Sequence, residues 1–337
     1  MKPPAPNFGH LLSMVGPYGV YEHAKFDVAR AQDGYCVDDM ARVLLVASRE
    51  RRPRADVLEL AQNALCFLAD AQTPNGTFVN RRDESGRFFG PASSEDCWGR
   101  ALWALGTAVA RLEDTDLVTQ ALLIFERGVQ VRSTWPRSMA YACLGASEVL
   151  SVKRASEGSR ELMVAALAML DRATISEDWQ WPEERLSYEN AVLPEALLAL
   201  GSMTGNPRVF QDGISQLGWL LAVETSRGHL SLTSSRGRHF DLRHEQFDQQ
   251  PIEVAALCDA CSRALRLTGD QRWARGIDDC VQWFLGRNDY GVMMFDPLTG
   301  GGYDGLTEHG INLNQGAEST LAMIATLQTA NLLQPVA

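Results

Sequence analysis

The sequence predicts an all-α protein in which six helical hairpins close into a single (α/α)6 toroid spanning residues 1–337. Three observations lead to this prediction. Six segments are apolar nearly all round, and five amphipathic segments alternate with them. Gly, Pro and Asn residues stand where turns are needed between these segments. No linker, charge block or low-complexity run divides the sequence, so we expect one domain.

Each apolar segment begins with a polar or charged cluster, and one residue of each cluster is used here to mark its position in the sequence. The markers are Asp39, Asp96, Arg137, Glu189, Glu253 and Glu318. They lie 41 to 65 residues apart, and each interval has room for two helices and two loops. Because a helix enclosed on every side is apolar all round, these six segments are predicted to be the inner helices.

The segments between the markers carry one apolar stripe and one charged face. They cover residues 57–72, 117–131, 162–173, 209–221 and 273–285. This pattern is typical of helices with one solvated face and predicts the outer helices. An ordinary bundle or an open solenoid is the alternative, but six units without polar capping repeats favour a closed ring. Strand is expected only as hairpins near 76–90 and 228–242.

The charge of the chain argues against some partners. The net charge is −11 and no basic stripe offsets it, which disfavours nucleic acid. No apolar run reaches the roughly 18 residues of a membrane span, and the start, Met1 to Pro4, lacks the apolar core of a signal peptide. We therefore expect a cytoplasmic protein.

Metal and cofactor sites are not predicted. The seven cysteines are an odd number and mostly lie in apolar helical segments, so reduced, buried thiols are expected. Cys258 and Cys261 form a C-x-x-C motif without a second pair. Among the histidines, His23, His239, His244 and His309 are too dispersed to predict a metal site.

The starts of the inner helices are the predicted site. In a ring of hairpins these helices run parallel, so their starts meet on one face. Free backbone N–H groups and the positive end of the helix dipole favour carboxylates there. Asp39, Glu95, Asp96 and Glu253 could therefore be simple caps. Capping does not explain the aromatic and amide side chains around them.

The aromatic and amide side chains near the helix starts are typical of a sugar-binding site. Trp and Tyr present flat apolar faces to a pyranose, and carboxylate, amide, Arg and His groups pair with its hydroxyls. The motif Trp179-Gln180-Trp181 in a polar loop is poorly explained as core. The predicted substrate-binding residues are His23, Tyr35, Glu95, Asp96, Trp98, Arg137, Trp179, Trp181, Glu183, Tyr188, Gln250, Glu253, His309, Gln315 and Glu318.

Hydrolysis of a glycosidic bond needs an acid and, in inverting enzymes, a base about 6.5–9.5 Å away. Inner helices one and four face each other in a six-unit ring, so Asp39 and Glu189 are the predicted catalytic pair, with Asp38 as the neighbouring alternative. Glu189 is the expected acid because Tyr188 and Trp181 would desolvate its carboxyl. Asp39, with Arg42 one turn on, is expected to stay ionised. Other carboxylates at the same level are rivals.

Several motifs resemble a known family. They are YGVYEHA at 18–24, GYCVDDMAR at 34–42, WQW at 179–181, YENAVLPEALL at 188–198, FDQQP at 247–251 and NQGAESTLA at 314–322. In order and wording they resemble the bacterial six-hairpin-glycosidase-like (α/α)6 domain, which occurs alone or fused behind glycosyltransferases. The resemblance implies a carbohydrate-associated toroid but no settled reaction. Because no glycosyltransferase domain precedes this copy, it is expected to act alone or with a separate partner.

Three functional hypotheses follow. The first is an inverting, metal-independent glycoside hydrolase acting on an oligosaccharide or bacterial glycan. The second is a non-catalytic carbohydrate-binding or scaffold domain serving a glycosyltransferase. The third is a sugar epimerase or lyase on the same toroid, which would use His and Tyr for proton transfer next to a sugar carbon.

Overall fold

The computed structural model describes residues 3–240 and 247–332, so His244 lies outside the described residues. Within these ranges the chain forms twelve α-helices joined by loops and short strands. None of the helices in this part of the chain is long and apolar enough to cross a membrane. The chain divides into two compact units. The N-terminal unit holds Leu11–Ala24 and Val28–Leu170, and the C-terminal unit holds the chain up to His10, Lys25–Asp27 and the chain from Asp171 onward.

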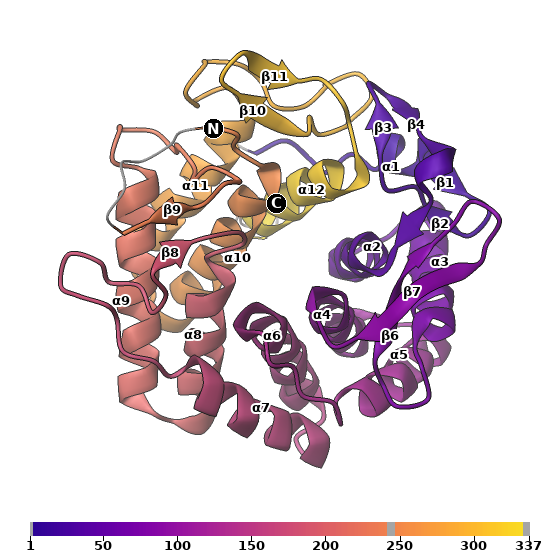
Figure 1. Ribbon diagram of the computed structural model, residues 1–337, viewed down its shortest axis with the longest axis horizontal. Coiled ribbons are helices and arrows are strands. Elements are labelled where there is room, and N and C mark those ends of the chain that lie inside the picture. The colour runs from indigo at the N-terminus through magenta and orange to yellow at the C-terminus, as the bar shows by residue number, and fades with distance from the viewer. Residues whose placement is uncertain (1–2, 241–246, 333–337) are drawn as a thin grey trace. The chain divides into compact units, whose positions relative to one another are not determined.

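The N-terminal unit has two layers of helices (Figure 1). One layer is α2 (Val37–Arg49), α4 (Asp96–Arg111) and α6 (Pro136–Val152), and the other is α3 (Ala55–Ala71), α5 (Thr115–Gly128) and α7 (Glu157–Leu170). In α6, 13 of 17 residues are buried, whereas α5 buries 5 of 14. This contrast confirms the predicted alternation of enclosed and half-solvated helices.

Small residues bring α4 and α6 together. A Cβ atom added at Gly106 would lie 2.2 Å from the carbonyl oxygen of Gly145, and one added at Gly99 would lie 2.4 Å from that of Ser138. Real side chains do not tolerate such distances, so glycine is required at both positions of α4. The small-residue composition of the enclosed segments is thus a consequence of close backbone packing.

The C-terminal unit repeats the two-layer pattern. The enclosed helices are α8 (Val192–Thr204), α10 (Pro251–Thr268) and α12 (Ala317–Asn331), and α9 (Pro207–Glu224) and α11 (Gln271–Phe284) pack on them. Buried polar links join the enclosed helices. Arg263 on α10 donates to Glu195 on α8 at 2.9 Å, and Thr329 on α12 donates to Asp259 on α10 at 2.7 Å.

The Gly, Pro and Asn residues predicted at turns begin or end helices in the structure. Asn206 caps α9 by accepting from the backbone N–H groups of Arg208 and Val209, and Pro207 follows at the first helical position. Gly205 and Gly269 end α8 and α10 with φ values of 66° and 72°, a region that favours glycine. The remaining helix, α1 (Gly9–Ser13), has only five residues, so long outer helices number five in the described chain.

Strand is confined to short pieces. β6 (Phe78–Arg82) and β7 (Phe88–Ser93) form the expected hairpin, and β5 (Tyr35–Cys36) adds to it with Tyr35 opposite Arg82. The hairpin expected near 228–242 is wrong for the residues described there. β9 (Arg238–His239) pairs instead with the distant β8 (Arg185–Leu186).

Other strands were not expected from the sequence. They are β1 (Val15–Gly16), β2 (Gly19–Val20), β3 (Ala24–Lys25), β4 (Val28–Ala29), β10 (Gly305–Thr307) and β11 (Gly310–Asn312), with a 3-10 turn at Ala31–Asp33. Strands of two or three residues are too short to show the alternating pattern by which strands are recognised.

Candidate functional site

In the N-terminal unit, the start of α2 carries a network of paired charges. We call it the α2 cluster: Asp38, Asn80, Asp96, Arg100 and Tyr141. Arg100 on α4 donates to Asp38 at 2.7 Å and to the Tyr141 hydroxyl on α6 at 3.1 Å. Asn80 on β6 donates to the other oxygen of Asp38 at 3.0 Å. The network therefore ties three enclosed helices and the hairpin together at one level.

The pKa values of the two neighbouring aspartates are shifted in opposite directions. Burial would raise the pKa of Asp38, but the charges of Arg100 and Arg42 and hydrogen bonds from Arg100 and Asn80 outweigh it, so the pKa is lowered. Burial raises the pKa of Asp39 more than the Arg42 charge lowers it. Asp39 pairs with Arg42 at 2.8 Å, and its expected role as the ionised carboxylate stays a prediction.

One group in this unit has the composition of a metal site. Ligand atoms of Glu22, Cys36 and Asp39 all lie within 4.8 Å of one another. Arg42 pairs with Asp39 at 2.8 Å, and Arg81 pairs with Glu22. Burial raises the pKa of the Cys36 thiol well above its ordinary value, and that thiol donates to Asp39. Both carboxylates already have arginine partners, so charge balance here requires no cation.

Aromatic residues predicted to bind sugar in this unit are buried. Tyr35 stacks on Tyr21 with 4.7 Å between ring centroids, and the Trp98 indole donates to the carbonyl of Gly128 at 3.0 Å. Neither side chain has measurable exposure. An enclosed ring has no face for a pyranose, so this prediction is corrected: both rings belong to the core. Trp135, directly before α6, is an aromatic residue that stays 56% exposed.

The other predicted residues of this unit lie at helix starts or in the first loop. Asp96 begins α4 and accepts from Ser138 at 2.8 Å. Glu95 is exposed at the N-cap of α4, where its side chain makes no capping bond. Arg137 is buried in the first turn of α6. His23 is half exposed, with Nδ1 3.4 Å from Asp33.

In the C-terminal unit, a carboxyl group is held where α8 and α10 begin. We call Glu189, Asn190 and Glu253 the α10 cluster. Glu253 stands in the first turn of α10 and accepts a hydrogen bond from the backbone N–H of Glu189. Its other oxygen accepts from the backbone and the side-chain amide of Asn190, at 3.3 and 3.4 Å. Asn190 also accepts from the Ser187 N–H at 2.8 Å, which fixes its orientation.

The environment of Glu253 keeps this carboxyl protonated. Burial is the largest cause, and the nearby carboxylates of Glu189 and Glu224 add to it. The hydrogen bonds from residues 189 and 190 oppose the shift without cancelling it, and the pKa of Glu253 is raised to about 8. At neutral pH the side chain is therefore mainly a neutral acid that can donate a proton.

Glu189 lies in an unusual backbone conformation. Its φ is 42°, in the left-handed region that residues other than glycine rarely adopt, and only 6% of the residue is exposed. Such strain persists where the surroundings hold it, and it is concentrated at functional sites. The raised pKa lies on Glu253, which the sequence analysis did not single out as the acid, and its main cause is burial.

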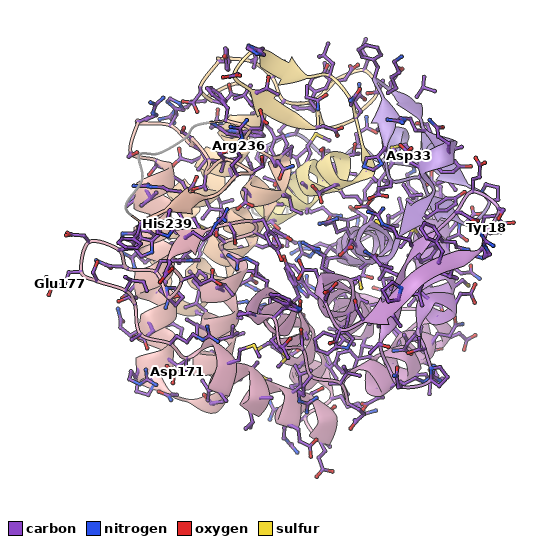
Figure 2. All side chains as sticks on the ribbon, in the orientation of Figure 1. Tyr18, Asp33, Asp171, Glu177, Arg236 and His239 are labelled. Carbon is purple, nitrogen blue, oxygen red and sulfur yellow. The ribbon has the colours of Figure 1, made fainter. Side chains whose placement is uncertain are left out.

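The Trp-x-Trp loop is also partly core. Its tip at Glu177 points away from the helices (Figure 2), whereas Trp179 and Trp181 turn inward and pack against Trp219 of α9, with centroid distances of 5.0 and 6.1 Å. Both are buried, so their prediction as sugar platforms is corrected. Tyr188, beside the α10 cluster, remains 41% exposed and keeps an accessible ring.

The remaining predicted residues of this unit vary in exposure. Gln250 is the N-cap residue of α10, and Glu318 stands in the first turn of α12. Gln315 is buried and accepts from the Thr299 hydroxyl at 2.8 Å. Glu183 is half-buried, and its carbonyl accepts from the Trp179 indole at 2.8 Å. His309 is exposed in the turn between β10 and β11.

Sequence reasoning missed a second carboxylate network. Asp289 accepts from Ser231 at 2.6 Å and lies 2.9 Å from His229 Nε2, and these bonds with that from Gln249 help to lower its pKa against its burial. Glu224 accepts from the Thr233 N–H and hydroxyl, and burial raises its pKa to about 7. Both carboxylates anchor the loop after α9, and no local motif could reveal them.

The structure thus brings the predicted residues together in two sets. The expected position at helix starts is confirmed for the markers on α2, α4, α6, α10 and α12, whereas Glu189 lies in the turn before α8. Asp39 belongs to the N-terminal unit and Glu189 to the C-terminal unit. Their pairing, and a groove shared by all predicted residues, stay predictions.

Comparison with solved structures establishes the fold class. A sugar epimerase from a ruminal bacterium is similar over 98% of this chain and 96% of its own, with a TM-score of 0.73 and 12% identity. Cellobiose 2-epimerase from Spirochaeta thermophila is similar over 96% of this chain and 94% of its own, with a TM-score of 0.67 and 14% identity. An α-mannanase from Bacteroides thetaiotaomicron is similar over 95% of this chain and 91% of its own, with a TM-score of 0.64 and 10% identity.

These proteins are (α/α)6 toroids of the six-hairpin glycosidase-like type, so the predicted all-α (α/α)6 fold is confirmed. No protein-family model matches the chain, and no curated protein matches it closely enough to show a family. At identities of 10–14% the likeness shows the fold alone.

Proposed function

We propose that the protein is a carbohydrate-active enzyme, a glycoside hydrolase acting on an oligosaccharide or bacterial glycan, with Glu253 as its general acid. The observation that carries the proposal is the carboxyl of Glu253, whose pKa is raised to about 8 at the start of an enclosed helix. Glycosidases need a carboxyl group that is still protonated at neutral pH. The fold supports the choice of substrate class, because the similar structures include a mannanase and a cellulase.

In the proposed reaction Glu253 gives its proton to the oxygen of the leaving sugar. Water adds to the anomeric carbon as the bond to that oxygen breaks, and Glu189 accepts the proton of the water. We expect inversion at the anomeric carbon. The role of acid thus moves from Glu189, where the sequence placed it, to Glu253, and Glu189 becomes the base. Tyr188 supplies an exposed ring beside the two carboxyls.

The test is a turnover screen with matched isosteric variants. Wild-type protein is incubated with a panel of mannosides, glucosides and galactosides, and new reducing ends are measured. Glu253→Gln and Glu189→Gln should each lower the rate about 10²- to 10⁴-fold, while circular dichroism and sugar binding stay as in the wild type. Wild-type rates in both variants would remove both residues from the mechanism.

A sugar epimerase or isomerase is the second candidate. The epimerases and the D-mannose isomerase among the similar structures have TM-scores of 0.67–0.73, above those of the mannanase and the cellulase. Here one carboxylate of the pair would take a proton from the carbon next to a sugar carbonyl, and the other, protonated by exchange with solvent, would give a proton to the opposite face. Reaction in D₂O separates the two: an epimerase puts deuterium on that carbon and creates no reducing ends.

A non-catalytic role, serving a glycosyltransferase or binding a glycan, is the third outcome of the same screen. It is the result if the wild type binds sugars but neither hydrolyses nor epimerises any of them. In that case the two Gln variants would match the wild type in every assay.

A further inference from the structure

Phe26 occupies a turn position that ordinarily belongs to glycine. It is the first of two residues between β3 and β4, and its φ is 54°. Two-residue turns that need a positive φ at this position use glycine, because a Cβ atom crowds the following carbonyl. A phenylalanine here keeps a large side chain at a conformational cost.

The backbone of Phe26 is clamped to the segment that leads into α12. Its N–H donates to Oδ1 of Asn314 at 3.0 Å, and its carbonyl accepts from the N–H of Gln315 at 2.9 Å. The carbonyl of Gln315 in turn accepts from Nε2 of His10 at 2.7 Å. All four residues belong to the C-terminal unit. The unfavourable conformation is thus held by three hydrogen bonds.

The side chain gains little from this arrangement in burial. Phe26 is 55% exposed, and among the described residues no other aromatic ring stacks on it. Nδ2 of Asn314 likewise makes no hydrogen bond within the described part of the chain, although the residue is partly accessible. A fixed, half-open ring beside a free amide donor is therefore presented where an enclosed helix begins.

We propose that Phe26 is a sugar-binding platform, a subsite at which its ring stacks on the C–H face of a pyranose while Nδ2 of Asn314 donates to a hydroxyl. A ring clamped in place loses little entropy when a ligand binds, which explains the retention of a strained aromatic at an exposed turn. Gln315, a predicted substrate contact, is buried directly behind the clamp. The inference rests on the proposed carbohydrate substrate, but not on which reaction is catalysed.

The experiment uses Phe26→Gly, Phe26→Trp and the control Phe89→Ala, which removes a similarly exposed phenylalanine from β7. Binding of cellotetraose, maltotetraose and mannotetraose is measured by titration calorimetry. We expect wild type to bind at least one of them, Phe26→Gly to bind it at least about tenfold more weakly, and Phe26→Trp and Phe89→Ala to bind it as well as wild type.

Unfolding in urea separates binding from structure. Glycine adopts the required φ freely, so the midpoint of Phe26→Gly should be no lower than that of wild type. A lower midpoint would mean that the ring is structural, and the proposal is then wrong. It is also wrong if Phe26→Gly keeps wild-type affinity, or if wild type binds none of the three oligosaccharides.

Failure of the proposed reaction gives a different result. If Glu253→Gln retains full turnover, the acid assignment fails while the binding difference between wild type and Phe26→Gly stands. If the binding difference is absent while Glu253→Gln is inactive, only the platform fails.

Discussion

Replacing Glu253 by glutamine should raise the stability relative to wild type as the pH rises, and this gain should be lost in acid. In the folded protein Glu253 holds its proton until about pH 8, whereas an unfolded glutamate releases it near its ordinary pKa of 4.5. Between these values the unfolded chain binds fewer protons, so the stability of wild type falls as pH rises. Below pH 4.5 Glu253 is protonated in both the folded and the unfolded protein, so its titration no longer lowers the stability of wild type.

The size of the effect follows from the two pKa values. The gap is about 3.5 pH units, and each unit is worth about 1.36 kcal/mol, which gives at most about 5 kcal/mol above pH 8. Glutamine keeps the shape of the protonated carboxyl and stays neutral, and its amide oxygen can accept the N–H of Glu189. Its NH2 group then faces the donors of Asn190, a cost that does not change with pH. The variant therefore avoids the cost that wild type bears. Titrating groups that do not interact with Glu253 are common to both proteins and cancel in the difference.

The assay is urea unfolding of wild type and Glu253→Gln at pH 4.5, 6 and 8, followed by far-ultraviolet circular dichroism. The control is Glu113→Gln, which changes a carboxyl on an exposed loop after α4. We expect the difference between Glu253→Gln and wild type to grow by several kcal/mol from pH 4.5 to 8, and that of the control to stay flat. A constant difference for Glu253→Gln would refute the raised pKa and the reasoning from burial.

Four further predictions concern the rest of the structure. Arg100→Met should lower the free energy of unfolding by about 3–5 kcal/mol in urea titrations, because Asp38 is left as a largely buried charge without its arginine; a change below 1 kcal/mol would count against the α2 cluster. Gly106→Ala should lower the melting temperature, since its Cβ would meet the carbonyl of Gly145 at 2.2 Å, and overpacking typically costs about 1–3 kcal/mol. A thiol reagent should modify only Cys66 in the folded protein, because the other six free cysteines are buried; two or more fast-reacting thiols would contradict this burial. A chelator should leave the melting temperature unchanged.

The fold could be predicted because the burial of each helix determines its pattern of apolar and polar residues. A helix enclosed on all sides needs apolar and small residues on every face, as α6 has. A helix with one solvent-exposed face must be amphipathic, as α5 is. The caps at Gly205 and Gly269 add local signals that need no tertiary context. Short strands such as β10 lack such signals.

The site could be predicted only in part, because its chemistry depends on distant partners. Asp38 is set apart from Asp39 by Arg100, 62 residues away, and Glu253 meets the turn at Glu189 from 64 residues away. Local sequence placed these carboxyls at helix starts, which is correct for α2 and α10. It could not assign the raised pKa.

The burial of aromatic residues also depends on distant partners. The polar loop around Trp181 predicts a ligand platform, but Trp181 stacks on Trp219, which lies on a helix further along the chain. Exposed rings at Tyr188 and Trp135 were not separable from buried ones without the tertiary structure.

The central claim is that Glu253 acts as an acid on a carbohydrate. Its most direct test is the pH dependence of kcat/KM of wild type on the best glycoside from the screen, measured from pH 5 to 9.5. Because the acid must be protonated, kcat/KM should fall tenfold per pH unit above about pH 8, the pKa to which burial raises Glu253. A rate that stays constant or rises through this range would contradict the account.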